Sequence, residues 1–172
     1  MFTKIDLCTM ALLKLGEKPL QSLTDEGAGA QLARTLFDAT IDTLIAIHPW
    51  RFATRTLELA RTTDGDFLIP ADVLRVLKCP GKINANRISA PGEKITIDAL
   101  VRVAPENFPG YFASLAASKL AVEFCMPLIA DGAMLRTLVA IYESELQSAK
   151  YIDSASMQSR GVESFSLIDA RF

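Results

Sequence analysis

His48-Pro49-Trp50-Arg51-Phe52-Ala53 holds the only His and the only Trp of the chain and follows a long amphipathic helical pattern. Pro49 cannot continue a helix, because it lacks an N–H and its ring clashes with the preceding turn. It also disfavours helical dihedrals at His48. The sequence therefore predicts that a helix ends here. We interpret His48, Pro49, Trp50 and Phe52 as a structural corner that fixes the angle between this helix and the next segment.

A long helix is expected before this corner, from about Asp25 to His48. Its apolar residues recur at three- and four-residue spacing, which is typical of one face of an amphipathic helix; they are Leu32, Ala33, Leu36, Phe37, Ile41, Leu44 and Ile45. Gly27 and Gly29 weaken the start, because each costs up to about 1 kcal/mol relative to Ala. The boundary can therefore lie one turn later.

A shorter helix is expected at the N-terminus, from Lys4 to Leu15. Thr3 can cap it, and Asp6 three residues later forms a variant of the capping box. Gly16 is placed to end the helix in the left-handed conformation.

Residues 52–104 follow a different pattern, with short, partly alternating and β-prone runs. These runs are separated by turn formers, namely Asp64-Gly65, Pro70, Pro80-Gly81 and Pro91-Gly92. We predict a small antiparallel sheet or a pair of hairpins in this stretch.

Two further helices are expected after the β-prone stretch. Pro109 is suited to the first helical position of one of them, and Pro127 ends or kinks it. Asp131 can cap the last helix, whose apolar stripe is Leu135, Leu138, Tyr142, Leu146, Ala149 and Ile152. Gly161 is expected to end this last helix.

These elements predict a mainly α fold: an antiparallel bundle of about four helices with a small antiparallel β insertion and an extended C-terminal tail. We assign residues 1–161 to one helical bundle domain, with the β insertion at about 52–104, and residues 162–172 to the tail.

Composition narrows the class of protein. Half of the residues are hydrophobic and 22% are charged, which excludes intrinsic disorder. The net charge is −2 and no Lys/Arg-rich run occurs, so duplex binding through a basic face is not expected. The apolar runs fall short of the ~20 residues that cross a membrane. Lys4 and Asp6 argue against a signal peptide, so synthesis in the cytoplasm is expected.

The sequence carries no recognisable catalytic or cofactor motif. The single histidine, His48, lies at a helix end, where its charge suits the helix dipole. Gly27-Ala28-Gly29-Ala30 lacks the remaining residues of a phosphate loop. Cys8, Cys79 and Cys125 have no metal or redox spacing and are interpreted as reduced core residues. We therefore expect no catalytic residue, cofactor or metal.

The C-terminal tail, residues 162–172, is the one segment for which the sequence indicates a binding function. Phe165, Leu167, Ile168 and Phe172 are apolar residues in a segment with no helix of its own. Such residues require a partner surface. Either the tail folds back on its own domain, or it extends onto another subunit, for example by adding a strand to an open sheet edge.

Several motifs in order along the chain resemble the head-to-tail adaptor family of tailed bacteriophages, also called tail tubular protein A or head-tail connectors, which extends to related gene transfer agents. The two most specific strings are His48-Pro49-Trp50-Arg51-Phe52-Ala53 and Ile69-Pro70-Ala71-Asp72-Val73-Leu74-Arg75-Val76-Leu77. The others are Ala11–Gly16, Pro19–Leu23, Ala33–Leu44, Phe112–Ala121, Tyr142, Leu146 and Ala149-Lys150 before Asp153.

The resemblance implies a structural, non-enzymatic subunit of a virion neck, assembled in the host cytoplasm. It implies a ring of about twelve copies beneath the portal protein, which surrounds the DNA channel without sequence-specific binding and offers a platform to a downstream tail or nozzle protein. By position, portal docking would fall to the tail, at Val162, Phe165, Leu167, Ile168, Arg171 and Phe172.

Two other functions remain open at this stage. One is an accessory cell-wall hydrolase of the virion with paired carboxylates, for which Glu143/Glu145 and Asp64/Asp66 are the visible acidic pairs. The other is a cytosolic helical module whose groove takes a partner helix.

Overall fold

The computed structural model describes residues 1–155, and the expected tail and the expected stop at Gly161 lie outside the described residues. In chain order the helices are α1 (Lys4–Lys14), α2 (Ala28–Ala46), α3 (Gly110–Leu128) and α4 (Gly132–Ala155). The strands are β1 (Thr54–Ala60), β2 (Phe67–Leu68), β3 (Val73–Lys78), β4 (Lys82–Asn84), β5 (Arg87–Ser89) and β6 (Lys94–Val101), and a short 3-10 helix covers Pro105–Asn107.

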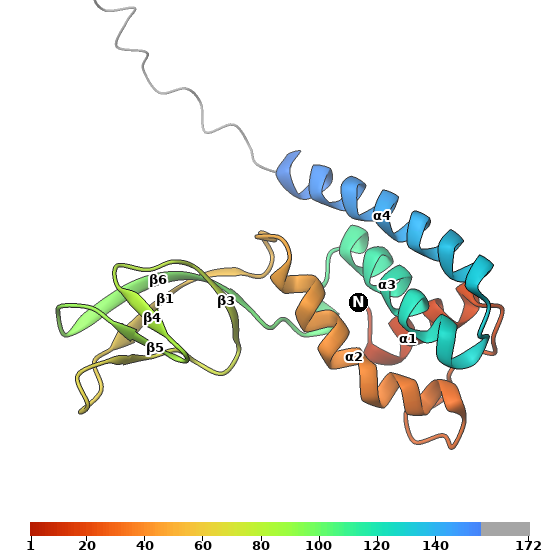
Figure 1. Cartoon of the computed structure of the whole chain (residues 1–172), viewed down its shortest axis with the longest axis horizontal. Coiled ribbons are helices and arrows are strands. Elements are labelled where there is room, and N and C mark those ends of the chain that lie inside the picture. Colours follow the sequence, from red (N-terminus) through yellow and green to blue (C-terminus); the bar gives the residue numbers. More distant parts are fainter. Residues whose placement is uncertain (156–172) are drawn as a thin grey trace, which may run out of the picture.

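The prediction of a mainly α bundle with a small β insertion is wrong. The fold is mixed α/β, with four helices and two three-stranded antiparallel sheets among residues 1–155. Figure 1 shows the sheets at one end of the molecule and the helices at the other. The sheets enclose a core of their own, built on Leu59, Phe67, Ile88, Ile95 and Ile97. Burial of apolar surface is the main driving force for folding. Because the sheets have a hydrophobic core of their own, they form a second structural part beside the helices and not an insertion into a bundle.

The caps of α1 form as the residues predict. Thr3 and Asp6 make the reciprocal capping box, in which the Asp6 N–H donates to Thr3 Oγ1 at 3.1 Å and the Thr3 N–H donates to Asp6 Oδ2 at 2.8 Å. Gly16 has a φ of 76°, so the predicted left-handed stop is confirmed.

The connection between α3 and α4 is short and tightly closed. Pro109 is the N-cap of α3 and not its first helical residue. Pro127 lies in the last turn, and the helix ends one residue later. Ala130 then adopts a φ of 55°, the left-handed position that Gly usually fills. Asp131 caps α4 as expected, since its Oδ1 accepts from the Ala133 N–H at 2.7 Å.

The helix α3 is the centre of the helical part, because α1, α2 and α4 all pack against it. Its buried residues cover several sides of the helix; they are Phe112, Ala113, Leu115, Ala116, Ala117, Ser118, Leu120, Ala121, Phe124 and Cys125. The many small side chains allow neighbouring helices to approach closely, and Figure 1 shows α3 between α4 and α1. Cys8 and Cys125 are buried as expected, whereas Cys79 is only partly buried.

The larger sheet has the strand order β1-β6-β3, and the smaller one has the order β2-β5-β4. The central strand β6 alternates between exposed and buried positions at its start, where Ile95 and Ile97 face the core of the sheets. That alternation is typical of a strand with one buried face. All six strands lie within the stretch 52–104 that the turn formers divide.

The strand β3 connects the two cores through two β-bulges. Its register with β6 shifts between Val73 and Arg75 and again between Val76 and Lys78. Each shift inserts one extra residue, Leu74 or Leu77, and a bulge re-aims the side chain it inserts. Both leucines pack against the core of the helices, whereas Val73 and Val76 pack against the core of the sheets.

Candidate functional site

The predicted corner lies at the turn between α2 and β1. The helix α2 ends at Ala46, and β1 begins at Thr54. Trp50 between them is fully buried, and its indole Nε1–H donates to the carbonyl of Leu44 at 2.9 Å. The carbonyl of Trp50 accepts the N–H of Thr54 at 2.9 Å, which starts the strand. One residue therefore connects the end of the helix to the beginning of the sheet, through its side chain on one side and its backbone on the other.

The corner is joined to α3 by an aromatic cluster. Trp50 lies edge-on to Phe112, with ring centroids 5.1 Å apart. Phe52 and Phe108 flank the same ring at 4.6 and 4.9 Å. Such tilted and edge-to-face pairs contribute about 0.5–1.5 kcal/mol each beyond their buried area. The two aromatic residues of the corner, Trp50 and Phe52, therefore pack in the main core, whereas Pro49 is exposed.

A buried carboxylate on α4 completes the corner. Asp153 is 3% exposed. Its Oδ1 accepts the Tyr111 hydroxyl at 2.6 Å, and both carboxylate oxygens lie 3.3 Å from the backbone N–H of Arg51. His48 Nε2 lies 3.7 Å from Asp153 Oδ2. Hydrogen bonds to a charged acceptor are the stronger kind, so Asp153 anchors the last described turn of α4 to the corner.

Sequence reasoning missed Asp153. The apolar stripe predicted Ile152 at the buried position, but Ile152 is 43% exposed and Asp153 takes that place. The available signal was the spacing of Ala149 and Asp153, which are four residues apart and lie on one face of the helix. A carboxylate there is tolerated only because donors from two other elements meet it.

Electrostatics at the corner reflect this burial. Burial lowers the pKa of His48, and the neighbouring Asp153 carboxylate opposes that shift. The pKa of Tyr111 is raised, first by burial and then by its hydrogen bond to Asp153. Tyr111 therefore stays protonated and donates its hydroxyl hydrogen to Asp153.

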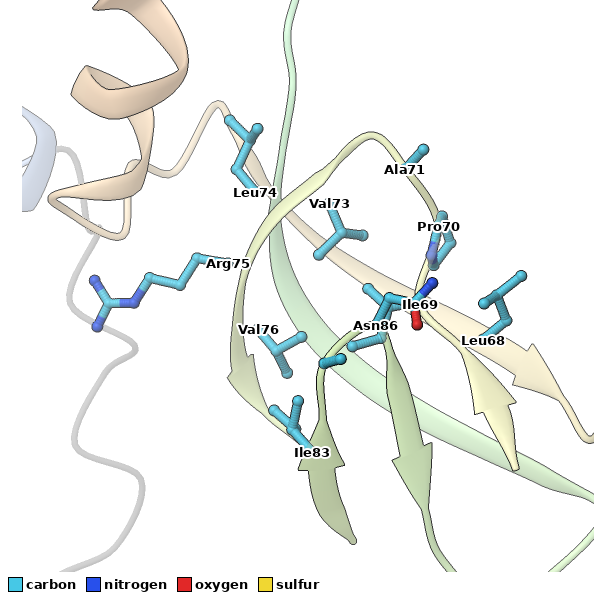
Figure 2. A pocket seen from close by; sticks show the side chains of 11 residues that line it. Leu68, Ile69, Pro70, Ala71, Val73, Leu74, Arg75, Val76, Ile83 and Asn86 are labelled. Atoms are coloured by element: carbon cyan, nitrogen blue, oxygen red, sulfur yellow. The ribbon is translucent and has the colours of Figure 1, made fainter. Parts of the chain in front are cut away.

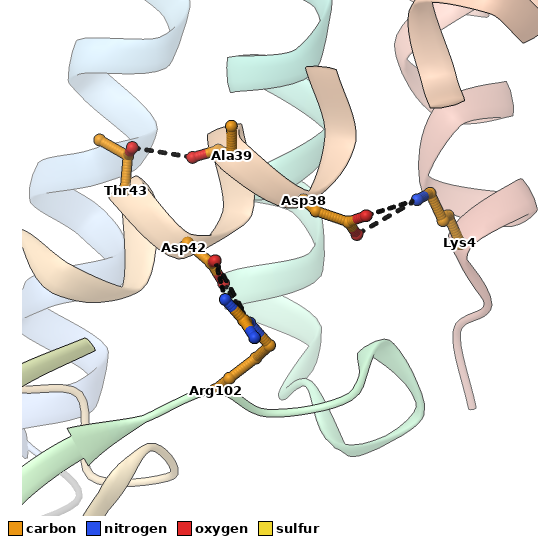
Figure 3. A network of polar contacts seen from close by, with 6 residues as sticks. All are labelled: Lys4, Asp38, Ala39, Asp42, Thr43 and Arg102. Carbon is orange, nitrogen blue, oxygen red and sulfur yellow. Dashed lines mark hydrogen bonds and ion pairs between the residues drawn. The ribbon is translucent and has the colours of Figure 1, made fainter. Parts of the chain in front are cut away.

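A second set of contacts joins the helices to the sheets. Arg75, from the second motif string, donates from Nη1 to the carbonyl of Ala46 at 3.0 Å. The Arg102 guanidinium binds Asp42 on α2, with Nε 2.9 Å from Oδ1 (Figure 3). The Arg102 N–H also donates to the carbonyl of Asp72 at 2.7 Å. We call these contacts, together with those of the corner, the joint.

A polar cluster around the buried Ser118 links three helices outside the joint. Ser118 on α3, which is 2% exposed, accepts from Lys14 of α1 and donates to Glu145 of α4. Lys14 Nζ and Glu145 Oε1 form an ion pair at 3.2 Å. A Ser–Lys pair can act as a nucleophile and base, but here the ammonium is paired with a carboxylate and the serine is out of solvent contact. The cluster therefore acts as a clasp between helices.

The acidic pairs considered for hydrolysis do not meet across a cleft. Asp64 pairs with Arg87 at 2.9 Å on the surface of the sheets, and Glu145 belongs to the clasp. Within residues 1–155 no group of His, Cys, Asp and Glu side chains is arranged to hold a metal ion. None of the helices in that range is both long and apolar enough to span a bilayer.

The six residues predicted to dock to a portal, Val162, Phe165, Leu167, Ile168, Arg171 and Phe172, lie outside the described residues. Asp153 of the joint stands two residues before the end of α4. The corner, the second motif string and the end of α4 are therefore connected to one another. Comparison of the chain with models of known families and with curated protein sequences returned no match.

Proposed function

We propose that the chain is a structural head-to-tail adaptor of a phage-type virion. In this role it forms a ring beneath the portal around the DNA channel, and its terminal segment from Val162 to Phe172 docks to the portal. The ring also offers a platform to a tail or nozzle protein. The resemblance of the two motif strings is the basis of the proposal.

The observation that carries the proposal is the way these two strings meet. Residues 48–53 and 69–77 are separate in sequence, yet Arg75 of the second string donates to the carbonyl of Ala46, two residues before the first string, at 3.0 Å. Asp153, in the last described turn of α4, binds the backbone of Arg51 in the first string. A subunit that transmits position between two neighbours needs its contact elements fixed to one another, and the joint provides that connection.

Charge also supports the proposal. A channel wall that binds phosphates gains affinity for DNA with every phosphate it neutralises, which would oppose movement of DNA. This chain has a net charge of −2. Several of its cations are also paired with carboxylates, as in Lys4–Asp38, Lys94–Glu58 and Arg102–Asp42. Figure 3 shows two of these pairs on α2.

The test uses the full chain and portal rings from the same phage or prophage. We expect wild-type protein to add a ring of density below the portal in electron micrographs of the mixture. The double variant Phe165→Asp/Leu167→Asp should lose this density and keep its far-ultraviolet circular dichroism. Ile141→Asp, a matched change of an exposed apolar residue on α4, should bind normally.

Two results would overturn the proposal. If wild-type protein leaves portal rings bare, the chain is not an adaptor for that portal. If the double variant joins portals as well as the wild type does, the terminal segment is not the docking element. Lysis of cell-wall preparations by the purified chain would instead support the hydrolase alternative.

A further inference from the structure

An apolar groove opens between the two sheets, along β3 and the smaller sheet. Its volume is about 610 Å³, and its walls include Leu68, Val73, Val76 and Ile83. Figure 2 shows Val76 on β3 and Ile83 on β4 close together on opposite walls. The mouth is unusually apolar for a surface, since Leu68 is 50% exposed and Ile83 is 46% exposed. Apolar side chains gathered at one hollow mark a site that a partner covers.

Both strands that border the groove are edge strands. The larger sheet ends at β3, and the smaller one ends at β4. Although the two strands follow each other in sequence, they pair with different neighbours and not with each other. The outer edge of β3 therefore offers backbone groups without a strand partner within residues 1–155. Such an edge is a template for an added strand.

The chain itself contains a segment whose pattern fits this groove. In an extended chain, successive side chains point to opposite sides. Phe165 and Leu167 would therefore share one side with Glu163, and Ser164 and Ser166 would share the other with Val162 and Ile168. The side that carries Phe165 and Leu167 could cover the groove. The sequence contains no proline in residues 156–172 that would block pairing.

The end of α4 and the groove both connect to the end of α2. Asp153 lies 3.7 Å from His48, which stands two residues after Ala46. The carbonyl of Ala46 is in turn bound by Arg75, which also lines the groove. The end of α4 and one residue that lines the groove, Arg75, therefore both contact the end of α2 or the turn that follows it. Residues 156–161 can span up to about 20 Å.

We propose that residues 162–168 dock in the groove of their own molecule as a strand added beside β3. Phe165 and Leu167 then lie against Val76 and Ile83. The biological role of this contact would be to hold residues 162–168 until they bind a portal, and this role rests on the function proposed above. The contact itself needs no partner, so its failure would leave portal docking untouched, and failure of portal docking would leave the contact untouched.

Hydrogen exchange of the isolated full chain tests the contact. We expect the amides of residues 162–168 to exchange at least about tenfold more slowly than those of an unstructured peptide. Ile83→Asp places a charge in the groove and should abolish that protection, and Leu68→Asp on another wall should do the same independently. The control Ile141→Asp changes an apolar residue of similar exposure, 42% against 46%, and should leave protection unchanged.

A disulfide experiment identifies which molecule supplies the segment. In a Cys79→Ala background, the pair Ile83→Cys and Leu167→Cys should form a disulfide in a species of monomer mass. The pair with Ser166→Cys, on the opposite side of the segment, should give a several-fold lower yield. Absence of protection in the wild type, or protection that survives both groove variants, would overturn the proposal. A disulfide found only at dimer mass would also overturn it and assign the groove to a second copy.

Discussion

The sharpest prediction concerns the carboxylate of Asp153. Replacement by Ala removes the acceptor of the Tyr111 hydroxyl and of the Arg51 N–H. A buried donor left without an acceptor costs about 1–3 kcal/mol. Both donors are only part-buried, and water recovers some of the loss. We therefore expect the free energy of unfolding to fall by about 2–3 kcal/mol, which lowers the melting temperature by roughly 5–10 °C.

The assay is urea denaturation followed by the fluorescence of Trp50. This residue is the only Trp of the chain, and its ring centroid lies 6.4 Å from that of Tyr111. Fluorescence therefore reports the corner directly. A double-mutant cycle with Tyr111→Phe isolates the pair, and we expect a coupling energy of about 1–2 kcal/mol. Asp64→Ala is the control, because Asp64 is exposed and pairs with Arg87 at the surface, where ion pairs contribute about 0–1 kcal/mol.

Two results would refute this reasoning. A loss below about 0.5 kcal/mol for Asp153→Ala would be no larger than that of an ordinary surface substitution. A coupling energy near zero would show that Tyr111 and Asp153 act independently. In either case the anchoring of α4 to the corner would have to come from apolar packing alone.

The free energy of unfolding should fall as the pH falls below about 6.5. The pKa of His48 is lowered in the folded protein, so the unfolded chain takes up a proton at a higher pH than the folded chain does. His48→Gln should flatten this part of the profile of unfolding free energy against pH. Gly81→Ala should be destabilising, because a Cβ at that position would lie 2.2 Å from the carbonyl oxygen of Ser89, and thermal unfolding should show the loss. In a thiol-reagent assay, Cys79 should react first in the native protein, since Cys8 is fully buried and burial raises its pKa to about 12.

Each of these expectations has a clear contrary result. An unchanged pH profile in His48→Gln would mean that another group controls acid stability. Wild-type stability in Gly81→Ala would mean that the loop before β4 shifts at no cost. Rapid modification of Cys8 in the native protein would mean that α1 opens easily. We expect the rate of Cys8 modification to be slow and to rise only when denaturant is added.

Much of the local structure follows from the residues themselves. The capping box of α1, the left-handed Gly16 and the cap of α4 at Asp131 are all local features, decided by side chains within three residues of the backbone they bind. The end of a helix before Pro49 is equally local, because the proline ring prohibits its continuation. Positions of this kind can be predicted from sequence with no knowledge of the rest of the fold.

The arrangement of the β part was decided by contacts across the chain. Short runs of alternating apolar and polar residues indicate strands, but they do not indicate how many sheets the strands form. The two bulges in β3 could not be predicted from the alternation of side chains along the strand. Leu74 and Leu77 interrupt that alternation, and both pack against the core of the helices. The expectation of a β insertion on a helical bundle failed for this reason: the strands build a core of their own.

The joint likewise exists only in the tertiary structure. The aromatic corner at Trp50 could be predicted from its own residues, because a proline and bulky rings act locally. The sequence did not indicate that Asp153 would be buried against that corner, since burial of a carboxylate depends on donors supplied by Tyr111 and by the backbone of Arg51. A charge is stable inside a protein only where distant parts of the chain bring it partners, and that information lies in the packing of the elements.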